Sequence, residues 1–125
     1  MSRARRVLLI EDDAEIRGFV RLALQDEGYE VIEAEHGAAA LALLARPDQS
    51  QPALILLDLR MPVMDGLAFA EAYRRLPGPH APIVAITATR DSAGSAAAVQ
   101  AAAILAKPFS LDELFAVVEH FVPHQ

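Results

Sequence analysis

Short apolar runs alternate along the chain with longer stretches in which apolar residues recur every three or four positions. Four of the short runs contain no polar residue, a pattern typical of strands in a parallel sheet that is covered on both faces. A fifth run, YEVIEA, combines β-branched and polar residues. We therefore predict five strands, at residues 7–10, 29–34, 53–57, 83–86 and 103–106.

Helical periodicity follows the first predicted strand and ends before the second. Asp12 or Asp13 can cap this helix at its start, and Gly28 ends it. The i, i+3, i+4, i+7, i+8 spacing of its apolar residues predicts one buried stripe. The residues of this stripe are Ile16, Phe19, Val20, Ala23 and Leu24.

Three later segments also have helical character. Helices are predicted at residues 38–46 and 67–76. The last helix starts with Ser110, because Glu113 three residues further on completes a capping box. The buried positions expected in this helix are Leu111, Leu114, Phe115, Val118 and Phe121.

These elements form a strand–helix unit that repeats five times, with a small-residue helix expected in the alanine-rich stretch 93–103. Right-handed crossovers then place helices on both faces of one parallel sheet. We predict a single α/β domain over residues 1–125. Its expected architecture is a flavodoxin-like (β/α)5 fold with the strand order 2-1-3-4-5.

Composition and charge narrow the classes of function. With 54% hydrophobic residues in 125 positions, the chain can bury a sizeable core and is not a disordered segment. A formal net charge of −6 disfavours nucleic acid as a direct partner. The chain has no cysteine, which excludes disulfides and thiolate metal sites. The first apolar run is too short for a signal peptide or a membrane span, so we expect a soluble cytoplasmic protein.

Polar residues follow four of the five predicted strands. They are Glu11, Asp12 and Asp13 after the first strand, Asp58 after the third, Thr87 after the fourth and Lys107 after the fifth. The carboxyl ends of parallel strands lie at one edge of a sheet, and the first and third strands are neighbours in the predicted order. Glu11, Asp12 and Asp58 should therefore converge.

Converging carboxylates become favourable when a hard divalent cation neutralises them, and Mg²⁺ takes oxygen ligands of this kind. Lys107 would add a compact positive charge for a phosphoryl group, and Thr87 a hydroxyl donor. Together these groups indicate a phosphoryl-transfer site in which an oxygen of Asp58 can be the nucleophile. Taken singly, each residue has a structural explanation, because acids after strands often cap helices or bond their own backbone in turns.

Four segments resemble, in order, the motifs of the receiver domains of two-component response regulators. They are LLIEDDAEIR at 8–17, LILLDLRMPVMDG at 54–66, IVAITA at 83–88 and AKPFSLDEL at 106–114. The resemblance covers essentially the whole chain. It implies a signalling switch rather than a metabolic enzyme, one that catalyses its own phosphorylation from a histidine kinase or phosphotransfer protein and slowly loses the phosphoryl group to water. A downstream protein target is also implied, and a homodimer is a further possibility.

The resemblance also implies roles around the metal. Asp58 matches the phosphoacceptor, and Glu11 and Asp12 match the acidic pair, with Asp12 as the direct Mg²⁺ ligand. Arg60 would provide its backbone carbonyl to the metal.

Thr87 and Lys107 match the hydroxyl and the lysine that contact phosphate, whereas Asp13 matches no ligand position and is better explained as a helix cap. Lys107–Pro108 resembles a peptide bond that is often cis in the family. We also expect Asp65–Gly66 to form a turn that needs a positive φ.

The chain departs from the family pattern before its last strand. Ile104 stands where an aromatic switch residue is common, and the spacing from Thr87 to Lys107 is short by about two residues for such a crossover. We therefore expect a non-standard output face, on a stand-alone regulator rather than an excised domain. Two alternatives stay open: a phosphate-independent adaptor, and an aspartyl-phosphate phosphatase, which the arginine at position 60 disfavours.

Overall fold

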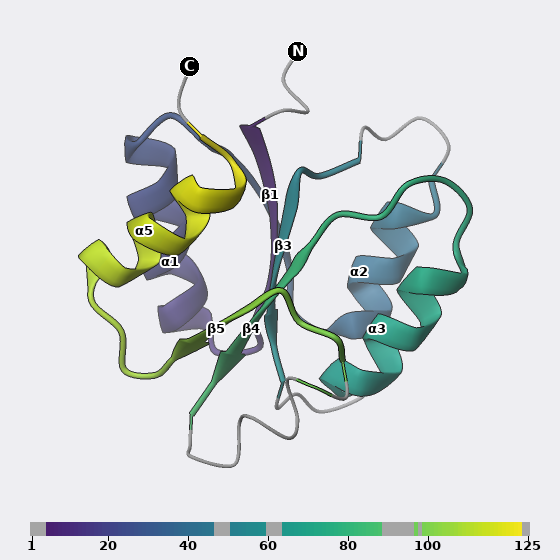
Figure 1. Ribbon diagram of the computed structural model, residues 1–125. Helices are drawn as coiled ribbons and strands as arrows, with labels where there is room; N and C mark the ends of the chain where they lie inside the picture. The colour runs from purple at the N-terminus through teal and green to yellow at the C-terminus, as the bar shows by residue number, and fades with distance from the viewer. Residues whose placement is uncertain (1–4, 47–50, 60–63, 89–96, 98, 124–125) are drawn as a thin grey trace.

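Five parallel strands form one sheet with helices on both faces in the computed structural model (Figure 1), which describes residues 5–46, 51–59, 64–88, 97 and 99–123. The strands are β1 (Arg6–Ile10), β2 (Glu30–Ala34), β3 (Leu54–Asp58), β4 (Ile83–Thr87) and β5 (Ala103–Ala106). Their order in the sheet is β2-β1-β3-β4-β5, which confirms the predicted flavodoxin-like topology.

The helices divide between the two faces of the sheet. They are α1 (Ala14–Asp26), α2 (Gly37–Leu44), α3 (Gly66–Arg75) and α5 (Leu111–Phe121). Figure 1 shows α1 and α5 on one face and α2 and α3 on the other. The small-residue helix expected between β4 and β5 lies mostly outside the described residues, although Ala97 is helical. In the part of the chain that the structure describes, no helix is long and apolar enough to cross a membrane.

Alternate residues of the central strands build two separate cores. Val7 and Leu9 of β1 pack with residues of α1 and α5, whereas Leu8 and Ile10 pack with residues of α2 and α3. Strand β3 is buried along its whole length. This two-sided burial is the reason that β1, β3 and β4 are continuously apolar in sequence.

Two of the predicted helix caps are present. The Asp13 carboxylate accepts hydrogen bonds from the backbone N–H groups of Glu15 (2.9 Å) and Ile16 (3.2 Å), so Asp13 rather than Asp12 caps α1. Ser110 and Glu113 form the expected capping box at the start of α5. The Lys107–Pro108 peptide bond is cis, as the resemblance implied.

Two residues expected in buried stripes are exposed. Phe19 of α1 is 47% exposed and Leu111 of α5 is 41% exposed. The buried residues of α1 are Val20 and Leu24, and those of α5 are Leu114 and Val118. Each helix therefore buries a narrow i, i+4 row against the sheet, and Phe19 and Leu111 lie beside that row because each residue turns the helix by about 100°.

The expectation of a positive φ at Gly66 is wrong. Among the described residues, Gly28 and Gly78 are the glycines with positive φ. Gly66 is the first residue of α3, and Asp65 caps this helix by accepting from the N–H of Ala68. Space explains the glycine instead, because a Cβ at this position would lie 2.8 Å from Cδ2 and 3.0 Å from Cα of Leu59.

Candidate functional site

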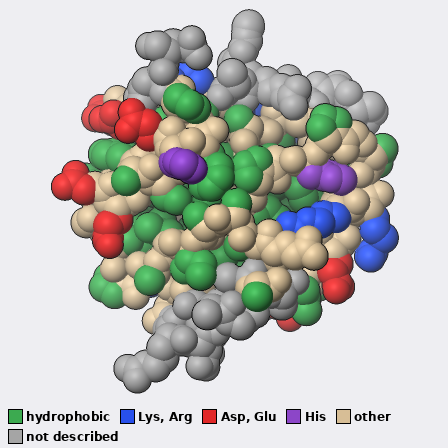
Figure 2. Space-filling view, in the orientation of Figure 1, with side chains coloured by type: hydrophobic (Ala, Val, Ile, Leu, Met, Phe, Trp, Pro, Cys, Tyr) green, Lys and Arg blue, Asp and Glu red, His purple; other side chains and the backbone are tan. Residues whose placement is uncertain are grey.

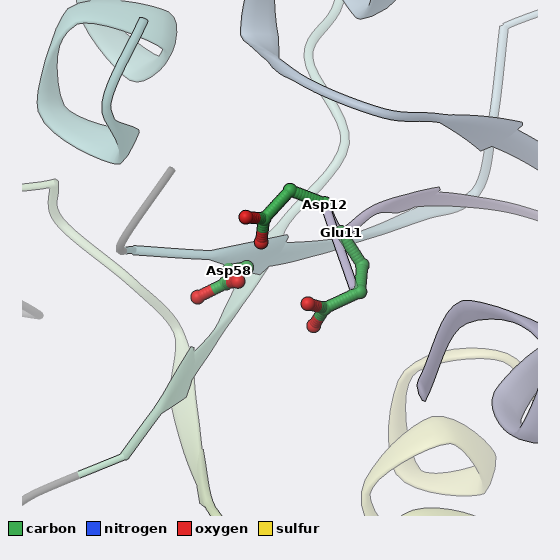
Figure 3. A group of neighbouring side chains, drawn as sticks. All are labelled: Glu11, Asp12 and Asp58. Carbon is green, nitrogen blue, oxygen red and sulfur yellow. The ribbon is translucent and has the colours of Figure 1, made fainter. Parts of the chain in front are cut away.

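Three carboxylates converge where β1 and β3 end (Figure 3). Glu11 and Asp12 directly follow β1, and Asp58 is the last residue of β3. Each residue offers an oxygen, and these three oxygens all lie within 4.8 Å of one another. Glu11 and Asp58 are buried, whereas Asp12 is exposed to solvent. The sequence prediction that these acids converge is therefore confirmed.

Lys107 brings a positive charge to the two buried carboxylates. It lies one residue beyond β5, where its backbone N–H donates to the carbonyl of Thr87 (2.6 Å). Its Nζ atom is 3.3 Å from Oε1 of Glu11 and 3.6 Å from Oδ2 of Asp58. One ammonium group thus faces two of the three acids.

Thr87 is the last residue of β4 and is almost completely buried. Its Oγ1 atom has no hydrogen-bond partner among the described residues. A buried hydroxyl without a partner is costly, so this group is available to a ligand oxygen that enters the site.

Glu11 carries the clearest electrostatic signal of the site. Burial raises the pKa of its carboxyl to about 7, and the charge of Asp58 acts in the same direction. The backbone N–H of Asp13 and the ammonium of Lys107 lower this pKa and offset part of the effect. A second cation nearby would stabilise the ionised form of a carboxyl group in this environment.

The backbone of Glu11 is held at both of its polar groups. Its N–H donates to the carbonyl of Ala34 (3.1 Å), and its carbonyl accepts from Nη1 of Arg17 (2.7 Å). Sequence reasoning assigned no role to Arg17. Its position in the sequence could have indicated one, because Arg17 comes four residues after the Asp13 cap and therefore lies about one helical turn beyond the acids.

Two further residues were singled out in the sequence. Arg60 is outside the described residues, so its carbonyl is not placed. Ile104 is on β5 and is 45% exposed.

The donor set suits a small, hard cation. All three acids offer oxygen ligands, one of them is open to solvent, and the buried pair lies beside the ammonium of Lys107. Hard divalent cations prefer such oxygen ligands and keep some of their waters. The cluster can therefore hold a metal ion.

Comparison with known proteins gives the family. The family model described as "Response regulator receiver domain" matches residues 7–119. The transcriptional regulatory protein PdtaR of Mycobacterium tuberculosis is 41% identical over 122 residues, which cover 92% of this chain and 55% of that protein. The DNA-binding transcriptional regulator NtrC of Escherichia coli is 36% identical over 120 residues, which cover 94% of this chain and 25% of that protein.

Solved structures agree with this assignment. The chemotaxis response regulator CheY4 of Vibrio cholerae has a TM-score of 0.82 and 33% identity, covering 93% of this chain and 97% of that one. A response regulator receiver protein from Burkholderia phymatum has a TM-score of 0.79 and 30% identity, covering 96% of each chain. The chain spans between a quarter and about half of the length of the two curated relatives named above. It belongs to the family of response regulator receiver domains, the signalling domains of two-component systems.

Proposed function

We propose that this chain is a phosphorylation-dependent switch that accepts a phosphoryl group on Asp58 from a phosphohistidine, in the presence of Mg²⁺. The donor would be a histidine kinase or a phosphotransfer protein. The observation that carries the proposal is the position of the Asp58 carboxylate, which is 3.6 Å from Nζ of Lys107 and clustered with Glu11 and Asp12.

The chemistry is an in-line displacement at phosphorus. An oxygen of Asp58 forms the new P–O bond while the P–N bond to the histidine breaks, and the imidazole that leaves takes up a proton from water. When bound, Mg²⁺ would neutralise charge on the phosphoryl oxygens, with Glu11, Asp12, Asp58 and the carbonyl of Arg60 as its protein ligands.

The other residues act on the transferred group. The ammonium of Lys107 lies near Glu11 and Asp58. A phosphoryl oxygen on Asp58 would compete with these acids for the ammonium and pair with it. The hydroxyl of Thr87, which has no partner among the described residues, can donate to a second phosphoryl oxygen. Both contacts favour the phosphorylated form, and slow attack of water on the acyl phosphate would reset the switch.

Intact mass spectrometry tests the proposal directly. The wild-type chain, incubated with Mg²⁺ and acetyl phosphate, should gain one phosphoryl group that hydroxylamine removes, since acyl phosphates react with this nucleophile. Asp58→Asn keeps the size of the side chain but removes the nucleophilic oxygen, so it should gain none. Addition of a chelator should suppress the wild-type reaction.

A wild-type chain that stays unmodified under these conditions would contradict the proposal and favour the phosphate-independent adaptor. A phosphoryl group that persists in Asp58→Asn would place the acceptor elsewhere. The downstream target, a homodimer and a non-standard output face around Ile104 are further parts of the proposal, and shift changes on beryllofluoride binding would test the last of these by NMR.

A further inference from the structure

We infer that Arg17 is a positioning residue, which fixes the backbone between Glu11 and Asp12 in the orientation that a divalent cation needs. The inference rests on the proposed function, because it concerns the Mg²⁺ site of that switch. It assigns a task to a side chain that touches neither the phosphoryl group nor the metal.

The carbonyl of Glu11 lies just past the end of the sheet. Strand β1 pairs with β2 and β3 as far as Ile10, and one further hydrogen bond joins the N–H of Glu11 to Ala34. The Glu11 carbonyl accepts instead from Nη1 of Arg17, at 2.7 Å. A charged donor at this distance makes a strong hydrogen bond, so the peptide group between Glu11 and Asp12 is held in one orientation.

The guanidinium of Arg17 is itself anchored on the neighbouring strand. Its Nε donates to Oε1 of Glu33 on β2 at 3.2 Å, and the second carboxylate oxygen of Glu33 accepts from Nη1 of Arg21 at 3.2 Å. The Arg17 side chain is only 17% exposed. A planar guanidinium bound to two partners has little freedom to turn, so lysine is not an equivalent replacement at such a position.

This arrangement joins the acidic pair to the start of α1. Asp13 caps the helix with its side chain, while its N–H donates to Oε2 of Glu11 at 3.1 Å. Arg17 lies one turn further along α1, and its backbone N–H bonds the carbonyl of Asp13 (2.9 Å). The loop that carries Glu11 and Asp12 is therefore held by hydrogen bonds to its backbone carbonyl and N–H groups and by the helix α1 that follows.

The loop with Glu11 and Asp12 has to be held in place because the three carboxylates repel one another. With their ligand oxygens within 4.8 Å, Glu11, Asp12 and Asp58 would lower their repulsion by moving apart in a loop that was free to turn. Mg²⁺ demands a nearly ideal octahedral geometry and tolerates such movement poorly.

Arg17 and Arg21 form a matched pair for an experiment. Both are on α1, and both bind Glu33 at 3.2 Å, but the Glu11 carbonyl accepts from Arg17. Removing a positive charge near a cation site should by electrostatics alone strengthen cation binding. Loss of positioning should weaken it, so the two explanations predict opposite signs.

The test is an NMR titration of the full chain with MgCl₂, following amide shifts in wild type, Arg17→Met, Arg17→Lys and Arg21→Met. Arg17→Met should raise the Kd for Mg²⁺ by about tenfold, at the lower end of what loss of a group that orients metal ligands costs. Arg17→Lys keeps the charge but lacks the planar fork that directs separate N–H groups to the carbonyl and the carboxylate, and should raise the Kd by a smaller factor. Arg21→Met should leave it unchanged.

The same spectra give a readout without metal. Before any MgCl₂ is added, the amides of Asp12 and Asp13 should shift in Arg17→Met but not in Arg21→Met. Thermal unfolding should show a larger loss of stability for Arg17→Met, which loses the bond to the Glu11 carbonyl as well as an ion pair to Glu33, than for Arg21→Met, which loses one ion pair. Arg17→Lys covers the case in which Arg17→Met does not fold.

The outcomes distinguish a failure of the proposed function from a failure of the role given to Arg17. A wild-type chain that binds no Mg²⁺ would contradict the proposed function itself. If the wild type binds Mg²⁺ and the Arg17 variants bind it equally well or more tightly, Arg17 is not a positioning residue. An equal weakening in Arg21→Met would also overturn the inference, because the effect would then belong to the ion-pair network as a whole.

Discussion

Nζ of Lys107 lies 3.3 Å from Oε1 of Glu11, a carboxylate whose side chain has no exposed surface. The two residues come from opposite ends of the chain. They meet because the carboxyl ends of the parallel strands β1 and β5 lie on the same side of the sheet. Their contact sets the charge of the site before any ligand enters.

Replacing Lys107 with Met should separate phosphorylation from metal binding. Phosphorylation of Asp58 should fall strongly, because the ammonium that pairs with the phosphoryl group is lost, whereas Mg²⁺ affinity should rise as a competing cation disappears. Without metal, stability should fall by about 2 kcal/mol, less than the ~3–5 kcal/mol for breaking a fully buried pair, because Glu11 can take up a proton. Urea unfolding, a Mg²⁺ titration and intact mass would measure the three effects.

Lys107→Arg is the control, since it keeps the charge. It should restore most of the lost stability while phosphorylation stays below wild type, because a planar guanidinium does not replace a compact ammonium at a phosphate. Unchanged phosphorylation in Lys107→Met would contradict the role given to Lys107.

The raised pKa of Glu11 predicts that the metal-free protein loses stability as the pH rises. Its pKa is about 7 in the folded chain against an ordinary value of 4.5. Between these values the folded state holds a proton that the unfolded state releases, so the contribution is fully present below pH 4.5 and lost as the pH rises through 7. The free energy of unfolding should therefore decrease across this window, as urea titrations in the presence of a chelator would show.

Glu11→Gln should remove that pH dependence, because an amide does not titrate. Mg²⁺ competes with the same proton, so the affinity of the wild type for Mg²⁺ should increase between pH 6 and pH 8 in calorimetric titrations. A wild type whose stability rises over this range would show that another group dominates its titration.

Much of the site was predictable because it depends on strand ends. Four of the five predicted strands are followed by a polar residue at the carboxyl end of the sheet, and topology alone brings Glu11, Asp12 and Asp58 together. The N-cap of α1 was also predictable in part, since a helix start needs one cap and Asp13 provides it.

Other features depend on distances between packed groups, which cannot be read from the spacing of apolar residues along the sequence. Phe19 has the spacing of a core residue, yet it lies beside the narrow row that α1 buries and is 47% exposed. Arg17 resembles any arginine on a helix surface, and its bond to the Glu11 carbonyl depends on the path of the chain after β1. Gly66 was assigned to a left-handed turn, because a glycine after an aspartate is typical of one, whereas the actual constraint is the backbone of Leu59.

The neighbouring acids Asp12 and Asp13 should respond differently to substitution. Asp12→Ala should weaken Mg²⁺ binding and slow phosphorylation of Asp58, because it removes the most accessible carboxylate of the cluster. Asp13→Ala should instead cost about 1 kcal/mol of stability, as expected for loss of an N-cap, with Mg²⁺ affinity nearly unchanged.

Asp13→Ser serves as the control, because serine also caps helices and should retain most of the stability. Thermal unfolding combined with a Mg²⁺ titration distinguishes the two positions. If Asp13→Ala abolished Mg²⁺ binding while the fold stayed intact, Asp13 would be a ligand and the assignment of the cap would be incomplete.

Two helical glycines should respond to alanine with opposite signs. Gly18 lies inside α1, where a Cβ would have one neighbour within 4 Å, Nη2 of Arg21 at 3.9 Å. Gly18→Ala should therefore stabilise the chain by about 0.5–1 kcal/mol, because alanine is the better helix former.

Gly66→Ala should destabilise the chain, because its Cβ would lie 3.0 Å from the Cα of Leu59, which is backbone and cannot rotate away. We expect a loss of about 1–3 kcal/mol, as for other overpacked sites. Leu59 directly follows Asp58 and is held by a hydrogen bond from its N–H to the carbonyl of Ile86 (3.1 Å), so a shift here should also slow phosphorylation. Urea unfolding of both variants and intact mass after acetyl phosphate treatment would show whether the effects divide in this way, and a stabilised Gly66→Ala would mean that Leu59 moves freely and does not constrain the phosphoacceptor.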